Sequence, residues 1–203
     1  MALWRSDDSL GGIPLAEVVA QVAPTVLIGA SGQPGAFSEE IVKQMASRVE
    51  RPVILPLSNP TSLAEASPTD LLHWTDGRAL VATGSPYGPV VHDAVSREIS
   101  QANNALAFPG LALGALAVRA SRITDRMLRA AAEALVGLAA SVEEGTPLLP
   151  AMANLRLTSV AVAAAVARAA AADGVAGEPV HDSIEDDVRA SMWDPHYRKV
   201  VAI

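Results

Sequence analysis

The sequence has no cysteine and few aromatic residues, and both absences limit what the protein can be. Without cysteine the chain can form neither disulfides nor thiolate metal sites, which is typical of a cytoplasmic protein. Aromatic residues make up 3% of the 203 residues and hydrophobic residues 50%, so the core must be built mainly from Ala, Val and Leu. Small side chains of this kind allow helices to approach one another closely.

Basic clusters and long apolar runs are missing as well. The net charge is −7 and no Lys/Arg cluster occurs, which argues against nucleic acid or an anionic membrane as the main partner. The first residues lack the basic region and apolar run of a signal peptide. The most apolar later segment, 160–172, is too short and too weakly hydrophobic to span a bilayer. We therefore expect a cytoplasmic protein that binds small molecules, not nucleic acid or membrane.

Candidates for acid–base or metal chemistry are scattered along the chain. No two histidines have metal-ligand spacing, and no G-x-S-x-G nucleophile motif is present. The histidines are His73, His92, His181 and His196. We expect the chain to contain no catalytic residue and no metal ligand.

Hydrophobic periodicity predicts alternating strands and helices in the first half. Short β-branched runs predict strands at 25–29, 53–57 and 79–83. Helical spacing predicts a helix at 15–22 and two more after Ser38 and Ser67, which suit N-cap positions. Strand, helix and strand follow one another as a βαβ unit, so we expect an α/β fold with a parallel sheet.

From Asn104 onward the chain is rich in Ala and Leu. Predicted helices span roughly 111–119, 124–141, 154–171 and 186–192. We expect an α/β part over about 15–110 and a helical part over about 111–203, packed around or beside the sheet within one domain.

Each predicted strand ends in a loop of small or polar residues, at 30–35, 58–61 and 84–89. Because the carboxyl ends of parallel strands lie at one edge, these loops are expected to form a ligand site. In the second loop Pro60 restricts its own φ and moves Asn59 out of the α region, so the turn would aim the Asn59 amide. An ordinary Asx turn explains the same sequence equally well.

A pair of amides, Asn103 and Asn104, follows further along the chain. Consecutive amides can donate to a carboxylate and accept from a hydroxyl, which suits a small hydroxy acid; helix capping is the alternative interpretation. The loop at 29–32 is not a dinucleotide fingerprint, because it lacks the full G-x-G-x-x-G and an acidic residue at the distance expected for ribose recognition.

Four segments carry the most specific pattern of the chain. They are PTVLIGASG (24–32), RPVILPLSNPT (51–61), DGRALVATGSPY (76–87) and NNALAFPG (103–110). In order and spacing they resemble the carboxy-terminal part of malic enzymes, and the resemblance runs from about Leu15 to the end, including WDPHY (193–197). It implies a partial Rossmann-like parallel sheet with flanking helices and a helical carboxy-terminal region.

Malic enzymes oxidise malate with NAD or NADP and decarboxylate the resulting oxaloacetate to pyruvate, using Mg²⁺ or Mn²⁺ as a Lewis acid. The resemblance implies that the first strand-end loop lines the nicotinamide ribose and that the amides bind malate. The implied cofactor contacts are Ala30, Ser31, Gly32 and Asn59, and the implied malate contacts are Asn59, Asn103 and Asn104.

The family's catalytic Tyr and Lys, metal-binding acids, malate-binding Arg and glycine fingerprint precede the region represented here. The chain alone is therefore expected to be inactive, and a divalent metal would bind only if the missing half were supplied. Three hypotheses remain: half of a malic enzyme completed by an amino-terminal half, a stand-alone binding or interaction module, or a repurposed small-molecule enzyme. The missing strands would leave an apolar edge at 25–29, which favours a homo-oligomer or a complementing partner.

Overall fold

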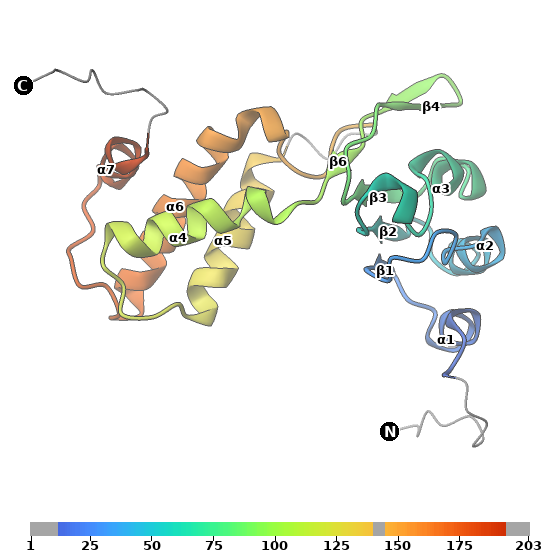
Figure 1. Ribbon diagram of the computed structural model, residues 1–203, viewed down its shortest axis with the longest axis horizontal. Helices are drawn as coiled ribbons and strands as arrows, with labels where there is room; N and C mark the ends of the chain where they lie inside the picture. The colour runs from blue at the N-terminus through green and yellow to red at the C-terminus, as the bar shows by residue number, and fades with distance from the viewer. Residues whose placement is uncertain (1–11, 140–144, 194–203) are drawn as a thin grey trace, which may run out of the picture. The chain divides into compact units, whose positions relative to one another are not determined.

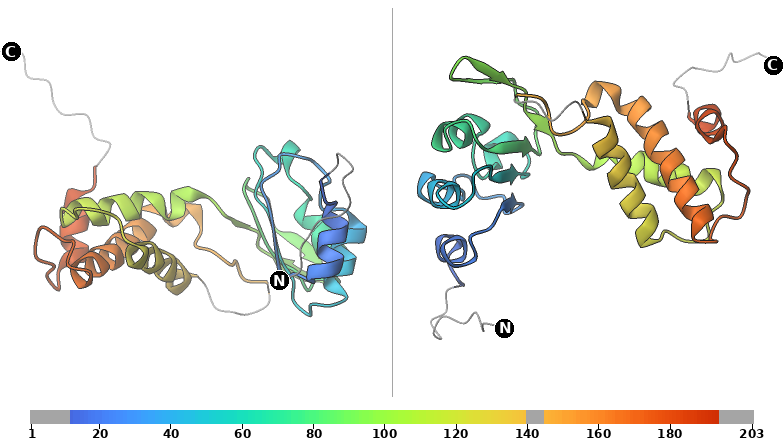
Figure 2. Two further views of the ribbon diagram at one scale, coloured as in Figure 1. Left: turned by 90° about the horizontal axis from the view of Figure 1, so that it is seen from below. Right: turned by 180° about the vertical axis from the view of Figure 1, so that it is seen from behind.

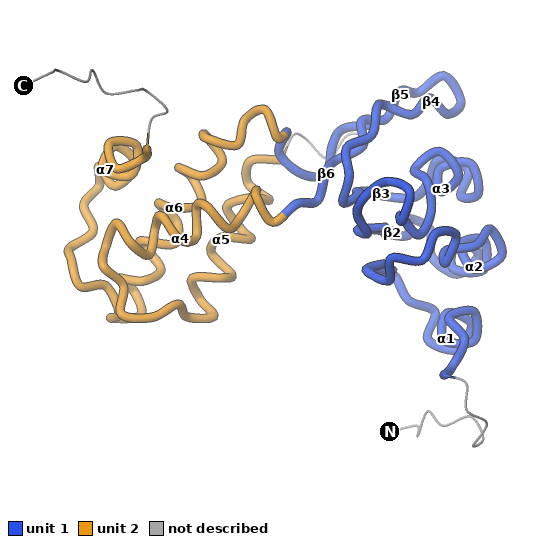
Figure 3. The backbone as a smooth tube through the Cα atoms, viewed as in Figure 1, with its two compact units in different colours: residues 1–103, 140–151 blue, residues 104–139, 152–203 orange. Residues whose placement is uncertain are grey.

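The computed structural model describes residues 12–139 and 145–193 and divides the chain into two compact units (Figure 3). Unit 1 comprises residues 1–103 and 140–151, and unit 2 comprises residues 104–139 and 152–203. Each unit has a hydrophobic cluster of its own. Two predicted features, the end of a helix at Ser141 and the DPHY portion of the last motif, lie outside the described residues.

Unit 1 contains a four-stranded sheet in the order β1-β2-β3-β6, and every pair in it is parallel. The strands are β1 Val26–Gly29, β2 Val53–Pro56, β3 Leu80–Thr83 and β6 Ser100–Gln101. The α/β fold with a parallel sheet is therefore confirmed. The sequence pattern did not predict β6, because a two-residue strand of polar residues leaves no hydrophobic run.

Three helices cover one face of this sheet, as Figures 1 and 2 show. They are α1 Leu15–Val22, α2 Glu39–Ala46 and α3 Pro68–Trp74. Leu27, Ile54 and Val81 lie side by side on the three neighbouring strands, and they are buried in the same cluster as the apolar side chains of the helices. The predicted caps are confirmed, since Ser38 Oγ accepts a hydrogen bond from Ile41 N and Ser67 Oγ accepts one from Asp70 N.

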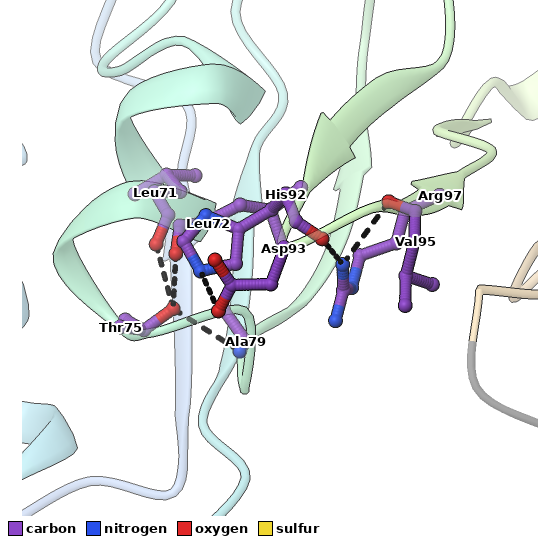
Figure 4. A network of polar contacts seen from close by, with 8 residues as sticks. All are labelled: Leu71, Leu72, Thr75, Ala79, His92, Asp93, Val95 and Arg97. Atoms are coloured by element: carbon purple, nitrogen blue, oxygen red, sulfur yellow. Dashed lines mark hydrogen bonds and ion pairs between the residues drawn. The ribbon is translucent and has the colours of Figure 1, made fainter.

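Between β3 and β6 the chain forms an antiparallel hairpin of β4 Val90–His92 and β5 Val95–Arg97. Its two turn residues, Asp93 and Ala94, have φ values of 48° and 62°, as a type I′ turn requires. Arg97 Nη1 donates to the carbonyls of His92 and Val95 and braces the turn (Figure 4). No hairpin was predicted here, because Asp-Ala is not a typical type I′ pair.

We expect Ala94→Gly to stabilise unit 1 by about 0.5–1 kcal/mol, because glycine adopts positive φ without the Cβ clash that Ala94 incurs. Urea unfolding followed by circular dichroism measures the change. Ala132→Gly is the control, since Ala132 lies inside a helix and its replacement should lower stability by about 1 kcal/mol. A loss of stability in Ala94→Gly would contradict the assigned turn.

Unit 2 is helical and is organised around its longest helix. It contains α4 Phe108–Ala117, α5 Asp125–Leu138, α6 Leu155–Ala172 and α7 Ile184–Ser191, with the short 3₁₀ turns η2 Asn104–Leu106 and η3 Met152–Asn154. Helix α6 contacts α4, α5 and α7 and contributes most of the buried residues of the cluster. Gly110 and Gly114 allow α4 to lie directly against it, since an added Cβ at either would meet atoms of α6 within 3 Å.

The expectation that the apolar segment at 160–172 is too short and too weakly hydrophobic to span a bilayer does not hold for the helix that contains it. By length and composition alone Met152–Ala172 is long and apolar enough to cross a membrane, with a mean hydropathy of 1.4 over an 18-residue stretch. Within the structure, 56% of that stretch is buried. An apolar composition on nearly all sides is what the central helix of a bundle requires, so the packing of unit 2 accounts for it.

Candidate functional site

The loops that follow β1, β2 and β3 meet at the carboxyl edge of the sheet, as the parallel register predicts. Gly32 N in the first loop donates to Ser58 Oγ in the second at 2.9 Å. Ser85 Oγ in the third loop donates to Asn59 Oδ1 in the second. The three loops are therefore joined to one another by hydrogen bonds.

A buried carboxylate, Glu65, holds the first two loops together. Its side chain is 0% exposed and accepts hydrogen bonds from Ser31 N at 2.7 Å, Ser31 Oγ at 2.8 Å and Ser58 Oγ at 2.5 Å. Burial by itself raises the pKa of Glu65, but the hydrogen bonds from Ser58 and Ser31 outweigh it and lower the pKa from 4.5 to about 2. Glu65 is thus ionised at neutral pH and positions the loops.

Glu65 was not among the residues predicted from the sequence. A single acid between Ala64 and Ala66, just after a ligand loop, was the available signal, because a charge in such a setting needs several hydrogen-bond donors. The position of the Glu65 carboxylate also explains why the residue at the end of β1, Gly29, is a glycine. A Cβ there would lie 2.6 Å from the Glu65 carboxyl carbon, so a side chain at this position would displace the carboxylate.

The Asn59 turn joins the second and third loops. The Asn59–Pro60 peptide bond is cis, Pro60 has φ −72°, and the Asn59 side chain is exposed. Asn59 Oδ1 accepts a hydrogen bond from Ser85 Oγ, and the Ser85 carbonyl accepts one from Thr83 Oγ1 at 2.8 Å. The amide therefore bridges two strand ends, and its Nδ2 donates to the Leu57 carbonyl at 3.4 Å.

Close approach of these two loops depends on Gly84. A Cβ at Gly84 would lie 2.1 Å from the Leu57 carbonyl oxygen and 2.9 Å from Asn59 Nδ2. Only glycine fits where the loop after β3 passes the Asn59 turn. Gln101 Nε2 donates to the Gly84 carbonyl at 3.1 Å, so Gln101, which carried no predicted role, supports the same loop.

The paired amides lie at the boundary of the two units. Asn103 follows β6 and is the last residue of the first segment of unit 1, and it comes directly after Ala102, whose N–H donates to the Thr83 carbonyl at 2.8 Å. Asn104 is exposed, begins η2 and belongs to unit 2. Asn103 therefore follows a strand end of the same sheet as Asn59, and malate binding by the two amides stays a prediction.

A pocket of about 290 Å³ opens beside the first two loops within unit 1. The rings of Phe37, Trp74 and Tyr87 line it together with several loop hydroxyls. Tyr87 is half-buried, and this burial raises the pKa of its hydroxyl. The ring forms part of the pocket wall.

The described residues lack a set of metal ligands, but they leave open space at the first loop. Within residues 12–139 and 145–193, no group of three or more His, Asp or Glu side chains could hold a metal ion, although the rings of His73 and His92 lie 6.4 Å apart. The part of the chain that the structure describes therefore offers no such ligand set for a divalent metal. A ligand could approach the main chain at Gly32, because this residue has φ +65° and a Cβ placed there would meet no atom within 4 Å. Contact of the first loop with the nicotinamide ribose stays a prediction.

Comparison with known proteins identifies the family of this chain. The family described as malic enzyme, NAD binding domain, matches residues 3–171. The chain belongs to the malic enzyme family. NAD-dependent malic enzyme 3 of Bacillus subtilis (strain 168) is 52% identical over 193 residues, which are 95% of this chain and 34% of that protein.

Solved malic enzymes share the fold. The Entamoeba histolytica malic enzyme superposes with a TM-score of 0.69 at 30% identity, covering 87% of this chain and 34% of that one. The malic enzyme from Pyrococcus horikoshii Ot3 superposes with a TM-score of 0.68 at 29% identity, covering 88% and 37%. This chain thus spans about a third of the length of the malic enzymes it matches, and the resemblance noted in the sequence is confirmed.

Proposed function

We propose that this chain supplies the nicotinamide-facing and malate-facing wall of a malic enzyme that converts malate to pyruvate with NAD. The convergence of Ser31, Gly32, Asn59 and Ser85 at one edge of a malic-enzyme NAD-binding fold carries the proposal. NAD is favoured over NADP because the Bacillus subtilis relative is named an NAD-dependent enzyme.

The residues of the wall would bind and orient. Ala30, Ser31 and Gly32 would pass along the nicotinamide ribose, with the loop held in place by Glu65. Asn59 would direct its exposed amide toward malate and the nicotinamide, since Ser85 fixes the orientation of its oxygen. Asn103 and Asn104 would add amides that hydrogen-bond the malate carboxylate and hydroxyl. Bound NAD supplies a hydride acceptor.

The chain alone would not catalyse the reaction. Proton transfer at neutral pH needs an acid or base whose pKa lies near the operating pH, whereas Glu65 is enclosed by donors and has a pKa of about 2. The same property argues against a repurposed enzyme that would use Glu65 as its base. The proton-transferring groups and the divalent metal would come with the remaining malic-enzyme sequence.

Complementation tests this proposal. The full chain is mixed with the portion of Bacillus subtilis NAD-dependent malic enzyme 3 that lies outside the matched third, and malate-dependent NADH formation is measured. We expect activity only in the mixture. We expect Asn59→Ala to lower kcat/KM of the mixture by about 100-fold, and Ser121→Ala, a change in the α4–α5 connection, to leave it unchanged. Persistent inactivity of a verified complex would refute the proposed function.

A further inference from the structure

The pocket beside the first two loops of unit 1 has aromatic rings in its wall. Its volume is about 290 Å³, and Phe37, Trp74 and Tyr87 supply the rings. Phe37 is 3% exposed and belongs to the hydrophobic cluster of unit 1, against which Trp74 packs. Phe37 N also donates to the Glu65 carbonyl at 3.1 Å. The core therefore holds Phe37 and Trp74 in place before any ligand binds, which is typical of small-molecule sites.

The charged side chains in the wall of the pocket are acidic. Glu65 and Asp70 line the pocket, and no lining residue that the structure describes is Lys, Arg or His. Asp70 is exposed and accepts a hydrogen bond from Ser67 Oγ at 2.7 Å. Two carboxylates without a basic neighbour in the wall favour a cationic ligand over an anionic one.

The N-termini of α2 and α3 also lie at the pocket, and each carries about half a positive charge. The first turn of α2 contains Glu40 as well as Glu39, whose charge Lys43 neutralises at 2.6 Å. The first turn of α3 contains Asp70. Glu40 and Asp70 thus offset the two partial charges, and Glu65 leaves the surroundings of the pocket negative.

We propose that this pocket binds a small organic ammonium cation, with its alkyl groups against the aromatic rings and its charge near Asp70. Aromatic faces attract ammonium groups that lie within about 6 Å of the ring centroid, most strongly when the ring belongs to Trp. A metal ion would find no set of three ligands among the described residues. None of the residues predicted to contact the cofactor or malate lines the pocket, so the inference does not rest on the proposed function.

The test uses choline, a quaternary ammonium compound, as the probe. The isotope-labelled full chain is titrated with choline, and NMR follows the indole N–H resonances. We expect a saturable shift of the Trp74 resonance, because the side chain of Trp74 lines the pocket. Trp193 is the internal control, since it is 78% exposed on unit 2, and its resonance should not move.

An uncharged analogue of choline, with carbon in place of the quaternary nitrogen, separates recognition of charge from burial of an apolar group. We expect the analogue to bind about tenfold more weakly than choline, since it has the same shape but is not attracted to aromatic faces or carboxylates. If the analogue binds as tightly as choline, the pocket recognises shape alone and the inference is wrong.

Two substitutions test the wall of the pocket. Tyr87→Leu removes a ring, and Asp70→Asn removes a charge but keeps an oxygen that can accept from Ser67. We expect each to weaken choline binding about fivefold. Asp125→Asn is the matched control, since Asp125 is an exposed acid in the first turn of α5, and it should bind choline as the unsubstituted chain does. Circular dichroism of the variants verifies folding.

Competition with NAD shows whether the pocket is part of the cofactor site. We expect NAD to leave the choline-induced shift of Trp74 unchanged, because the predicted cofactor contacts do not line the pocket. Displacement of choline by NAD would place the cation in the cofactor site and overturn the inference. Equal shifts of Trp74 and Trp193, or the lack of a saturable shift, would overturn it as well, while the proposed function would stand in each case.

Discussion

Glu65→Gln is expected to destabilise unit 1 by about 3 kcal/mol, even though the substitution preserves the size of the side chain. The carboxylate accepts from the backbone N–H and hydroxyl of Ser31 and from the hydroxyl of Ser58, and it is fully buried. A glutamine would offer only a neutral oxygen to the three donors that share Oε1, and it would turn its amide N–H toward Ser58 N, which donates to Oε2. It would therefore lose the charge-assisted hydrogen bonds that lower the pKa of Glu65 to about 2. Urea unfolding followed by circular dichroism measures the loss.

The control for this change is Glu133→Gln. Glu133 forms an exposed ion pair with Arg129 on α5, so its replacement should cost no more than about 0.5 kcal/mol. Equal effects of the two substitutions would show that the Glu65 network does not hold the loops together.

The same carboxylate gives unit 1 a defined dependence on pH. Because the pKa of Glu65 is lower in the folded chain, about 2, than the ordinary 4.5, its stabilisation is present above about pH 4.5. The stabilisation is lost progressively as the pH falls from about 4.5 toward 2. Glu65→Gln should remove this part of the acid dependence, and an unchanged acid profile in the variant would contradict the lowered pKa.

Gly114→Ala is expected to destabilise unit 2 by about 2 kcal/mol, although alanine favours helices. A Cβ at Gly114 would lie 2.3 Å from the carbonyl oxygen of Ala163 and 2.9 Å from Val166 Cβ. Helix α4 would therefore have to move away from α6, and the contacts of both helices in the cluster would loosen. Thermal unfolding followed by circular dichroism measures the effect.

Gly137→Ala provides a control of opposite sign. Gly137 lies in α5, and a Cβ there would meet nothing within 4 Å, so the substitution should stabilise the helix by up to about 1 kcal/mol. If Gly114→Ala were also stabilising, the close contact of α4 with α6 would be refuted.

Local sequence signals predicted those features that depend on neighbouring residues. The runs at 25–29, 53–57 and 79–83 became β1, β2 and β3, since a strand buried among others requires consecutive apolar residues. Ser38 and Ser67 were predicted as caps, because a hydroxyl three residues before its donor is a short-range pattern.

Features that depend on distant residues escaped the sequence pattern. Strand β6 exists because it pairs with β3, and its two polar residues carry no signal of their own. The Asp93-Ala94 turn was missed because Arg97 and the paired strands hold Ala94 in an unfavourable conformation. The contact of Glu65 with Ser31 spans 34 residues, so no local motif announces it.

The sequence by itself determined the family, the parallel α/β fold and the Asn59 turn, because these follow from hydrophobic period, from proline and from four motifs in a fixed order. Only the tertiary structure decided what holds the site together. It placed a buried carboxylate under two loops and joined Asn59 to Ser85, since such partners meet only after the strands align. It also left Val26 and Ile28 of β1 exposed on the face opposite the helices, which the hydrophobic run alone does not indicate.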